Sequence, residues 1–348
     1  MKGYQHILKA FVKLGSFIDE FCENVNDSNA EKFVVFHKTI RIAEQQNGWF
    51  TKENIMYCLQ EWATLLTEAN LTNWLTKYNL EQNRPSKTIG IVMAGNIPLV
   101  GFHDFLCVLF SGNKVLVKLS SNDKVLLPFL TDFLLQQEPS LKEKIHFTDG
   151  KFEGFDAIIA TGSNNTSRYF EYYFGKKPNI IRKNRSSVAI LSGNETKAQL
   201  ALLGEDIFRY YGLGCRNVSK VYVPKDYDLS TLYEAIFNFK DIINQHKYAN
   251  NYDYNKAVYL MSDFKILDNG FLILKEDDGF SSPISVLFYS YYESESELRG
   301  SLEKHSDTIQ CIVASGESEG DIAFGQTQKP QLHDYADAVD TMEFLLQL

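Results

Sequence analysis

Apolar residues recur at helical spacing in the first part of the chain. Over residues 7–21 they follow a period of about 3.6 residues, the period of an amphipathic helix: Ile7, Leu8, Phe11, Val12, Leu14, Phe17, Ile18 and Phe21. A second helix is predicted over about residues 29–46, and Thr51 is placed to cap a third. We expect residues 1–85 to form a helical segment that packs on the domain after it.

The pattern changes after Pro85, where short apolar strands alternate with helices. Residues 88–119 read as strand, helix and strand, a βαβ unit that favours a parallel sheet. Further elements are predicted at residues 123–135, 155–163, 165–174, 179–182 and 187–191. This alternation is typical of a doubly wound dinucleotide-binding domain, which we place at residues 86–193.

Helices and strands alternate again after residue 194. A helix should run to about Tyr210, followed by Cys215 at a bend and by a strand at residues 220–224. The predicted fold class is therefore α/β, with two doubly wound domains after the helical segment. The second domain spans residues 194–315 and carries Cys215, and residues 316–348 form a C-terminal segment.

Composition and charge narrow the classes of function. A chain of 348 residues with 44% hydrophobic and 23% charged residues is typical of a globular protein with two domains. The formal net charge is -9 and there is no arginine-rich tract, so we expect no nucleic-acid partner. No run reaches about 18 apolar residues, and the N-terminus lacks the features of a secretory signal, so no integral membrane segment is expected.

Five cysteines are scattered along the chain: Cys22, Cys58, Cys107, Cys215 and Cys311. They form no CxxC pair, so no metal site is predicted. Their odd number and spacing give no disulfide framework, which fits a reducing cytoplasm.

Three loops carry candidate chemistry: AGNIP at residues 94–98, ATGS at 160–163 and GLGC at 212–215. The first two follow predicted strands, and strand ends are where an open α/β sheet binds its ligand. None of the three is a GxGxxG fingerprint. In the third loop, Cys215 follows Gly-x-Gly at a bend, where small residues leave space around its sulfur.

The order of these loops resembles the aldehyde dehydrogenase superfamily. The resemblance rests on four features: Asn96-Ile97-Pro98, Lys118, Thr161-Gly162-Ser163 and Cys215. It covers about residues 86–290 and is closest to the acyl-CoA reductase (LuxC-like) family. It implies an aldehyde-dehydrogenase-like fold.

The resemblance also implies the catalytic residues. Cys215 would be the nucleophile, attacking an acyl thioester as a thiolate, and the alternative is a structural thiol. Asn96 would donate to the carbonyl oxygen together with the Cys215 backbone N–H, and the alternative is that Asn96 only shapes a turn.

The cofactor residues implied by the resemblance are Lys118, Ser120, Ser121, Thr161, Gly162, Ser163 and Asp278. Lys118 would bind the adenosine ribose or a phosphate, unless it is a surface lysine at a strand end. Many NAD-preferring relatives have a glutamate where this chain has Ser121, so NADPH is favoured, with NADH left open. Gly162 and Ser163 would bind a phosphate at a helix start, where Ser163 can also be an N-cap. Asp278, before Phe280, is the nearest match to the family's glutamate that binds the nicotinamide ribose.

One departure from the superfamily pattern is informative. Hydrolytic relatives have a glutamate roughly 30 to 35 residues before the cysteine, whereas residues 180–191, IIRKNRSSVAIL, contain no carboxylate. Thioester chemistry is therefore favoured over oxidation to an acid, because a thiolate needs no activated water. Glu195 and Glu205 remain candidates to replace the missing base. The cluster Arg182, Lys183 and Arg185 either contacts the phosphates of coenzyme A or NADPH or is solvated.

We therefore expect NADPH-dependent reduction of a fatty acyl-CoA to the aldehyde. The alternatives are an aldehyde dehydrogenase or acyl-phosphate reductase on the same scaffold, and a non-catalytic nucleotide-binding subunit of an acyl-transfer complex. The resemblance also suggests a homo-oligomer, paired through residues 316–348, and an acyl-transfer partner protein.

Overall fold

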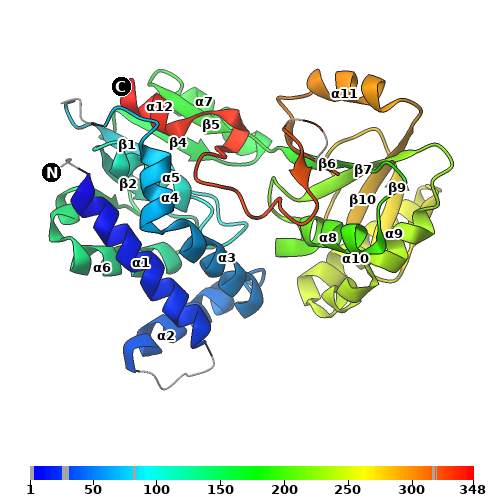
Figure 1. The fold of residues 1–348 in the computed structure, drawn as a ribbon, viewed down its shortest axis with the longest axis horizontal. Helices are drawn as coiled ribbons and strands as arrows, with labels where there is room; N and C mark the ends of the chain where they lie inside the picture. The colour runs from blue at the N-terminus through cyan, green and yellow to red at the C-terminus, as the bar shows by residue number, and fades with distance from the viewer. Residues whose placement is uncertain (1–3, 26–30, 81–83, 316–317, 319) are drawn as a thin grey trace. The chain divides into compact units, whose positions relative to one another are not determined.

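The computed structural model describes residues 4–25, 31–80, 84–315, 318 and 320–348 (Figure 1). The chain divides into two compact units, which we call unit 1 and unit 2. Unit 1 comprises Met1–Lys183 and Gln331–Leu348, and unit 2 comprises Asn184–Pro330.

Unit 1 begins with the expected helical segment: α1 (Gln5–Glu23), α2 (Val34–Gln46), α3 (Lys52–Leu65) and α4 (Glu68–Leu75). The apolar stripe of α1 is buried, and Thr51 caps α3 by accepting a hydrogen bond from the Asn54 N–H. The predicted start of α2 lies partly outside the described residues, and α4 was not predicted. The segment packs on helix α6 (Leu126–Gln137), where the rings of Phe36 and Phe129 stack with their centroids 4.3 Å apart.

A five-stranded sheet forms the core of unit 1, in the order β3-β2-β1-β4-β5, with every pair parallel. Its strands are β1 (Thr88–Val92), β2 (Lys114–Lys118), β3 (Ile145–Phe147), β4 (Ala157–Thr161) and β5 (Asn179–Arg182), and its helices include α5 (Phe102–Phe110) and α7 (Asn164–Phe174). Val92 pairs with both Lys118 and Ala160, so the loop after β1 leaves the sheet between the loops after β2 and β4. This is the switch point at which open α/β sheets bind ligands.

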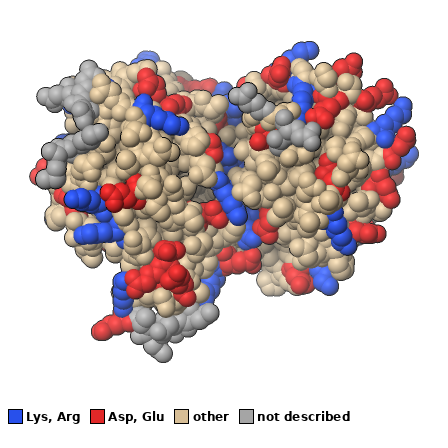
Figure 2. All heavy atoms as spheres, in the orientation of Figure 1, with Lys and Arg blue, Asp and Glu red and all other residues tan. Residues whose placement is uncertain are grey.

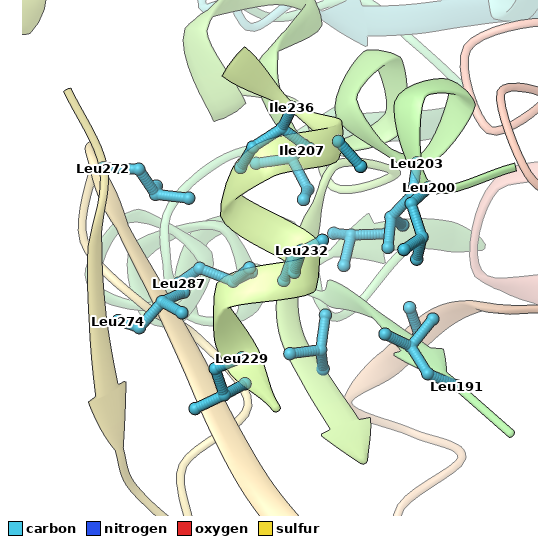
Figure 3. Close-up of a cluster of buried hydrophobic side chains, with 14 of the residues drawn as sticks. Leu191, Leu200, Leu203, Ile207, Leu229, Leu232, Ile236, Leu272, Leu274 and Leu287 are labelled. Carbon is cyan, nitrogen blue, oxygen red and sulfur yellow. The ribbon is translucent and has the colours of Figure 1, made fainter. Parts of the chain in front are cut away.

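Unit 2 holds a seven-stranded sheet in the order β12-β11-β6-β7-β10-β9-β8, in which only the β8–β9 pair is antiparallel. Its strands are β6 (Ser186–Ile190), β7 (Val218–Pro224), β8 (Ile266–Asp268), β9 (Ile273–Glu276), β10 (Val286–Tyr292), β11 (Ile309–Ala314) and β12 (Ile322–Ala323). The helices are α8 (Lys197–Phe208), α9 (Leu229–Ala235), α10 (His246–Met261) and α11 (Glu295–Glu303). Apolar side chains of α8, α9 and the central strands form its core (Figure 3).

Two expectations about the domains need correction. The strand predicted at residues 187–191 was assigned to the first sheet, but β6 pairs with β7 and β11 in the second. The chain therefore passes between the units at Lys183–Asn184, ten residues before the predicted boundary after residue 193. A strand's sequence does not reveal which of two sheets supplies its neighbours.

The end of the chain returns to unit 1. The Trp74 indole nitrogen lies 2.8 Å from the Tyr335 hydroxyl, and the Tyr78 hydroxyl lies 2.8 Å from an Asp340 carboxylate oxygen. The chain ends in a short helix, α12 (Thr341–Leu346). Within the described residues, no helix is both long and apolar enough to cross a membrane.

Candidate functional site

The predicted site residues of unit 1 gather at the carboxyl edge of its sheet: Asn96, Lys118, Ser120, Ser121, Thr161, Gly162 and Ser163. Lys118 and Thr161 end β2 and β4 and are half-buried, whereas Asn96, Ser121 and Ser163 are exposed in the loops beyond. Asp278 and Cys215 belong to unit 2. The predicted residues of unit 1 therefore lie along one continuous edge of its sheet, and open α/β sheets commonly bind ligands at this edge.

The loop that carries Asn96 is held in place by hydrogen bonds with two buried polar side chains, Asn47 and Asp123. The Asn47 amide nitrogen donates to the Gly95 carbonyl oxygen at 3.1 Å and to the Asn122 carbonyl oxygen at 3.3 Å. The Leu99 N–H donates to the Asp123 carboxylate at 3.1 Å. Because Asn47 and Asp123 are both buried, these bonds hold the loop while Asn96 remains exposed.

Gly95 brings the loops after β1 and β2 into contact. A Cβ at Gly95 would lie only 2.5 Å from the Ser120 Oγ and 2.7 Å from the Ser120 Cβ, so any other residue at position 95 would force Ser120 to shift. Burial raises the pKa of Asp123 to about 6, an effect that its backbone hydrogen bonds oppose. The chain thus places a carboxyl group that titrates in an accessible pH range beneath the Asn96 loop.

The loop after β4 leads directly into helix α7. The Ser163 hydroxyl accepts a hydrogen bond from the Thr166 N–H at 3.3 Å, which confirms Ser163 as an N-cap. A Cβ at Gly162 would lie 3.0 Å from the Thr166 side chain, so glycine suits the close packing here. The start of an eleven-residue helix offers backbone N–H groups and a positive partial charge. Together with Lys118, these features fit the phosphates and ribose of a dinucleotide.

In unit 2, Cys215 lies on a turn between α8 and β7. Tyr210, Tyr211 and Gly212, just before the turn, adopt φ values of 55°, 59° and 76°. Left-handed backbone is unfavourable for tyrosine and is often found near functional sites. Of the five cysteines, all within the described residues, Cys215 is exposed, Cys22 is half-buried and the others are buried.

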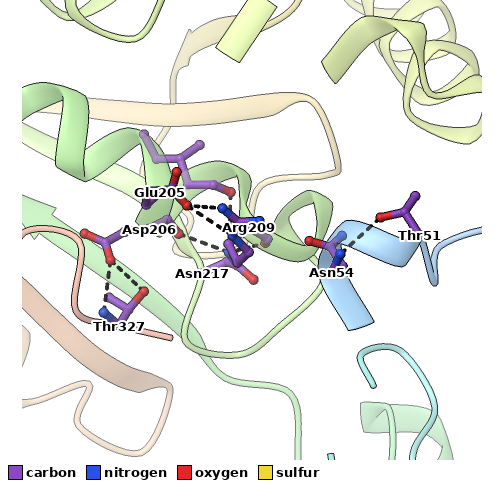
Figure 4. Close-up of polar contacts among 8 residues, drawn as sticks. Thr51, Asn54, Glu205, Asp206, Arg209, Asn217 and Thr327 are labelled. Atoms are coloured by element: carbon purple, nitrogen blue, oxygen red, sulfur yellow. Dashed lines mark hydrogen bonds and ion pairs between the residues drawn. The ribbon is translucent and has the colours of Figure 1, made fainter. Parts of the chain in front are cut away.

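Asn217 fixes this turn with both ends of its side chain, and Figure 4 shows it beside Asp206 and Arg209. Its Oδ1 accepts from the Gly214 N–H at 2.8 Å. Its Nδ2 donates to the carbonyl oxygens of Asp206 and Arg209 at 3.0 and 2.8 Å. The Cys215 carbonyl oxygen accepts from the Ser187 hydroxyl at 3.0 Å. Sequence reasoning missed Asn217, although an asparagine two residues after a candidate nucleophile at a bend is a signal for such a turn.

Asp278 is exposed, and its neighbour Asp277 makes the contacts in this loop. The Asp277 carboxylate is ion-paired with Lys275, and its backbone oxygen accepts from the Lys220 amino group at 2.7 Å. The loop is also bonded to the strand that follows the Cys215 turn, because the Ser219 hydroxyl donates to the Phe280 carbonyl oxygen at 2.5 Å. Asp278 therefore lies on a loop that is anchored to β7.

The cluster Arg182, Lys183 and Arg185 is engaged within the protein. Arg182 is buried and forms a bidentate ion pair with Asp104, with Nη2 and Oδ1 2.8 Å apart, so it is neither solvated nor open to a phosphate. Lys183 pairs with Glu171 at 2.9 Å, and Arg185 donates to the Ser306 carbonyl oxygen at 2.9 Å.

The charged residues that lie close to Cys215 in the sequence also have local partners. Arg216 lies with a guanidinium nitrogen 3.5 Å from the Cys311 sulfur. Glu205 pairs with Arg209 at 2.6 Å, and Glu195 accepts from the Ser192 N–H at 2.6 Å. The two glutamates that could replace a hydrolytic base are thus held in local structure.

On the face shown in Figure 2, basic and acidic side chains are interspersed. Among the described residues, no group of three or more histidine, cysteine, aspartate or glutamate side chains could hold a metal ion.

Solved structures with the same fold are aldehyde dehydrogenases. A Mycobacterium tuberculosis aldehyde dehydrogenase complexed with NAD+ matches with a TM-score of 0.61 and 13% identity, over 87% of this chain and 72% of that one. An NAD-dependent aldehyde dehydrogenase from Sinorhizobium meliloti matches with 0.61 and 11%, over 94% and 72%. The P. syringae indole-3-acetaldehyde dehydrogenase in complex with NAD+ and IAA matches with 0.64 and 12%, over 90% and 72%. The aldehyde-dehydrogenase-like fold expected from the sequence is confirmed.

Residues 18–236 match the acyl-CoA reductase (LuxC) family. The chain belongs to this family, which confirms the resemblance seen in its loops and makes it an oxidoreductase that acts on acyl or aldehyde groups. A search of curated protein sequences finds no match.

Proposed function

We propose that this protein reduces an acyl-CoA thioester to the aldehyde with NADPH, through an acyl-enzyme on Cys215. The observation that carries the proposal is the placement of Cys215. It is exposed on a turn that Asn217 fixes, in a member of a family of acyl-CoA reductases.

The reaction begins at the Cys215 sulfur. The thiolate attacks the thioester carbonyl carbon, the bond from that carbon to coenzyme A breaks, and coenzyme A leaves as a thiolate that takes a proton from solvent. When bound, NADPH supplies the hydride that converts the acyl-enzyme to a thiohemiacetal. Release of the aldehyde then restores the Cys215 thiolate for the next turnover.

Asn96 is proposed to donate its side-chain amide to the carbonyl oxygen, together with the Cys215 backbone N–H. Its exposed position in a loop that Asn47 and Asp123 fix supports this role, because oxyanion donors act best when already in place. Loss of one such donor costs roughly 3 kcal/mol of transition-state stabilisation.

The cofactor is proposed to bind at the carboxyl edge of the sheet in unit 1. Lys118 would contact the adenosine ribose or a phosphate, and Gly162 and Ser163 would present helix N–H groups to a phosphate. The solved structures of the same fold include complexes with NAD+. Ser121 supports NADPH over NADH, because its exposed hydroxyl carries no negative charge to repel a 2′-phosphate. Asp278 remains the candidate for the nicotinamide ribose.

Thioester chemistry is favoured over hydrolysis because Glu195 and Glu205, the two candidate bases for water, are engaged in local contacts. Glu205 is ion-paired with Arg209, and Glu195 accepts hydrogen bonds from its own turn. A thiol acceptor needs no such base.

We propose a fatty acyl-CoA as the substrate. We also propose that the enzyme is a homo-oligomer and works with an acyl-transfer partner. A cytoplasmic location is proposed because the scattered cysteines suit a reducing compartment.

Turnover of acyl-CoAs of increasing chain length tests the proposal, with NADPH oxidation and aldehyde formation both measured. The native protein should form one aldehyde per NADPH, and Cys215→Ala should not. Cys22→Ala is the matched control, because Cys22 is half-buried on α1, and it should retain activity. Turnover with acyl phosphate but not acyl-CoA would favour the acyl-phosphate reductase instead.

A further inference from the structure

Gln328 lies beside the Cys215 turn, although it is more than one hundred residues further along the chain. A Cβ at Gly214 would be 3.9 Å from the Gln328 Nε2 atom and 3.9 Å from its Oε1 atom. Both residues belong to unit 2. We propose that the Gln328 carboxamide donates a hydrogen bond to the carbonyl oxygen of the acyl substrate during attack by Cys215, an inference that rests on the proposed function.

The first support is an unsatisfied donor. The Gln328 Nε2 atom is buried and, among the residues that the structure describes, has no hydrogen-bond partner. A buried amide donor without an acceptor is destabilising, so its presence calls for an explanation. An acceptor that arrives with the substrate provides one.

The second support is the way the segment is held. The buried Asp206 carboxylate accepts from the Gly325 N–H at 2.6 Å, the Thr327 N–H at 3.0 Å and the Thr327 hydroxyl at 2.8 Å (Figure 4). The Asp206 backbone oxygen accepts from Asn217. One residue of α8 therefore fixes both the Cys215 turn and the segment that ends in Gln328, which sets their relative position.

The third support is that several polar groups of the turn already have partners. Asn217 bonds both the N–H and the carbonyl oxygen of Gly214, at 2.8 and 3.1 Å. The Cys215 carbonyl oxygen accepts from Ser187. Because these groups are already hydrogen-bonded by Asn217 and Ser187, they do not need the Gln328 amide as a partner.

The chemistry of the step suits a neutral donor. As the Cys215 sulfur bonds to the carbonyl carbon, the carbonyl oxygen gains negative charge, and this charge is lost again when the bond to coenzyme A breaks. A glutamine N–H stabilises that oxygen without giving up its proton. Gln328 would thus act in the acylation step, before any hydride is transferred.

The test is the rate of coenzyme A release in a single turnover without NADPH, measured over a range of acyl-CoA concentrations. Gln328→Met keeps the length of the side chain and removes the donor. We expect its maximal acylation rate to fall by roughly 10²-fold, with Gln328→Asn recovering part of the rate. The matched control is Gln326→Met, an exposed residue of the same segment, which should acylate at the native rate.

Two measurements keep the outcomes apart. Thermal unfolding and iodoacetamide labelling of Cys215 show whether Gln328→Met is folded with an accessible thiol. Equal maximal rates of coenzyme A release for native protein and Gln328→Met would overturn the inference. A change only in the acyl-CoA concentration needed for half the maximal rate would overturn it as well. Failure of the native protein to release coenzyme A would instead refute the proposed function.

Discussion

The Asn217 Nδ2 atom donates a hydrogen bond to the Asp206 carbonyl oxygen, 3.0 Å away, where helix α8 leads into the Cys215 turn. Asn217 also bonds Arg209 and Gly214, so a single buried side chain closes the turn on both sides. The exposed cysteine is therefore attached to a rigid support, which is what a nucleophile needs in order to meet its substrate in a fixed geometry.

Asn217→Ala should lower the free energy of unfolding by about 2–4 kcal/mol, because it leaves buried backbone groups without their partners. Urea unfolding measures the change. The matched control is Asn255→Ala, which removes another buried asparagine of unit 2 whose amide donates to the Ile284 carbonyl oxygen. Its loss should be smaller, and equal losses in the two variants would contradict the role given to Asn217.

The buried pair Arg182 and Asp104 should contribute to stability and not to ligand binding. Arg182→Met leaves the Asp104 carboxylate buried without its cation, and we expect a loss of about 3–5 kcal/mol. The double variant Asp104→Leu with Arg182→Met should recover part of this loss, since no charge is then left unpaired. Chemical unfolding tests both. Weaker NADPH or coenzyme A binding at native stability would show that Arg182 contacts a phosphate after all.

The pKa of Asp123, raised to about 6 by burial, links stability to pH. Between about pH 4 and pH 6 the unfolded chain has already lost this proton while the folded protein retains it. Stability from this group is therefore greatest at low pH, falls as pH rises through that window and is constant above it. The total effect should be about 2–3 kcal/mol.

Asp123→Asn isolates this contribution, because the amide cannot ionise but can still accept from the Leu99 N–H. The unfolding free energy of the variant minus that of the native protein should increase from about pH 4 to pH 6 and then level off. A difference that stays flat would mean that Asp123 has an ordinary pKa in the folded protein, and one that falls with increasing pH would mean that folding lowers its pKa.

Ser121→Glu should shift cofactor preference from NADPH towards NADH. The new carboxylate would repel a 2′-phosphate and could accept hydrogen bonds from the ribose hydroxyls, so the ratio of kcat/KM for NADPH over NADH should fall at least roughly tenfold. Ser121→Gln is the control of matched size without the charge. If the two variants behave alike, the adenosine ribose does not lie near Ser121.

The sequence predicted most elements of the fold because their signals are local. The apolar stripe of α1, the Thr51 cap and the βαβ unit from residue 88 each depend on neighbouring residues, and each is present. Helix α4 escaped notice because it is short and has only a few buried residues. The sheet to which β6 belongs depends on strands far away in the chain.

The same distinction holds for the site. Cys215 and the residues of the sheet edge were visible as short motifs at strand ends and bends. The bonds from Asp206 to Gly325 and Thr327 were not, because they join residues about 120 positions apart and aspartate on a helix is usually exposed. The left-handed tyrosines before Gly212 were equally hidden, since bulky residues give no sequence signal for such a backbone.

The most direct test of the central claim is to find where the acyl group is attached. The native protein would be mixed with acyl-CoA without NADPH, digested and analysed by mass spectrometry. The account predicts one acyl group per chain, on the peptide that contains Cys215, which disappears when NADPH is added and aldehyde forms. An acyl group on another residue, or aldehyde formation by Cys215→Ala, would contradict it.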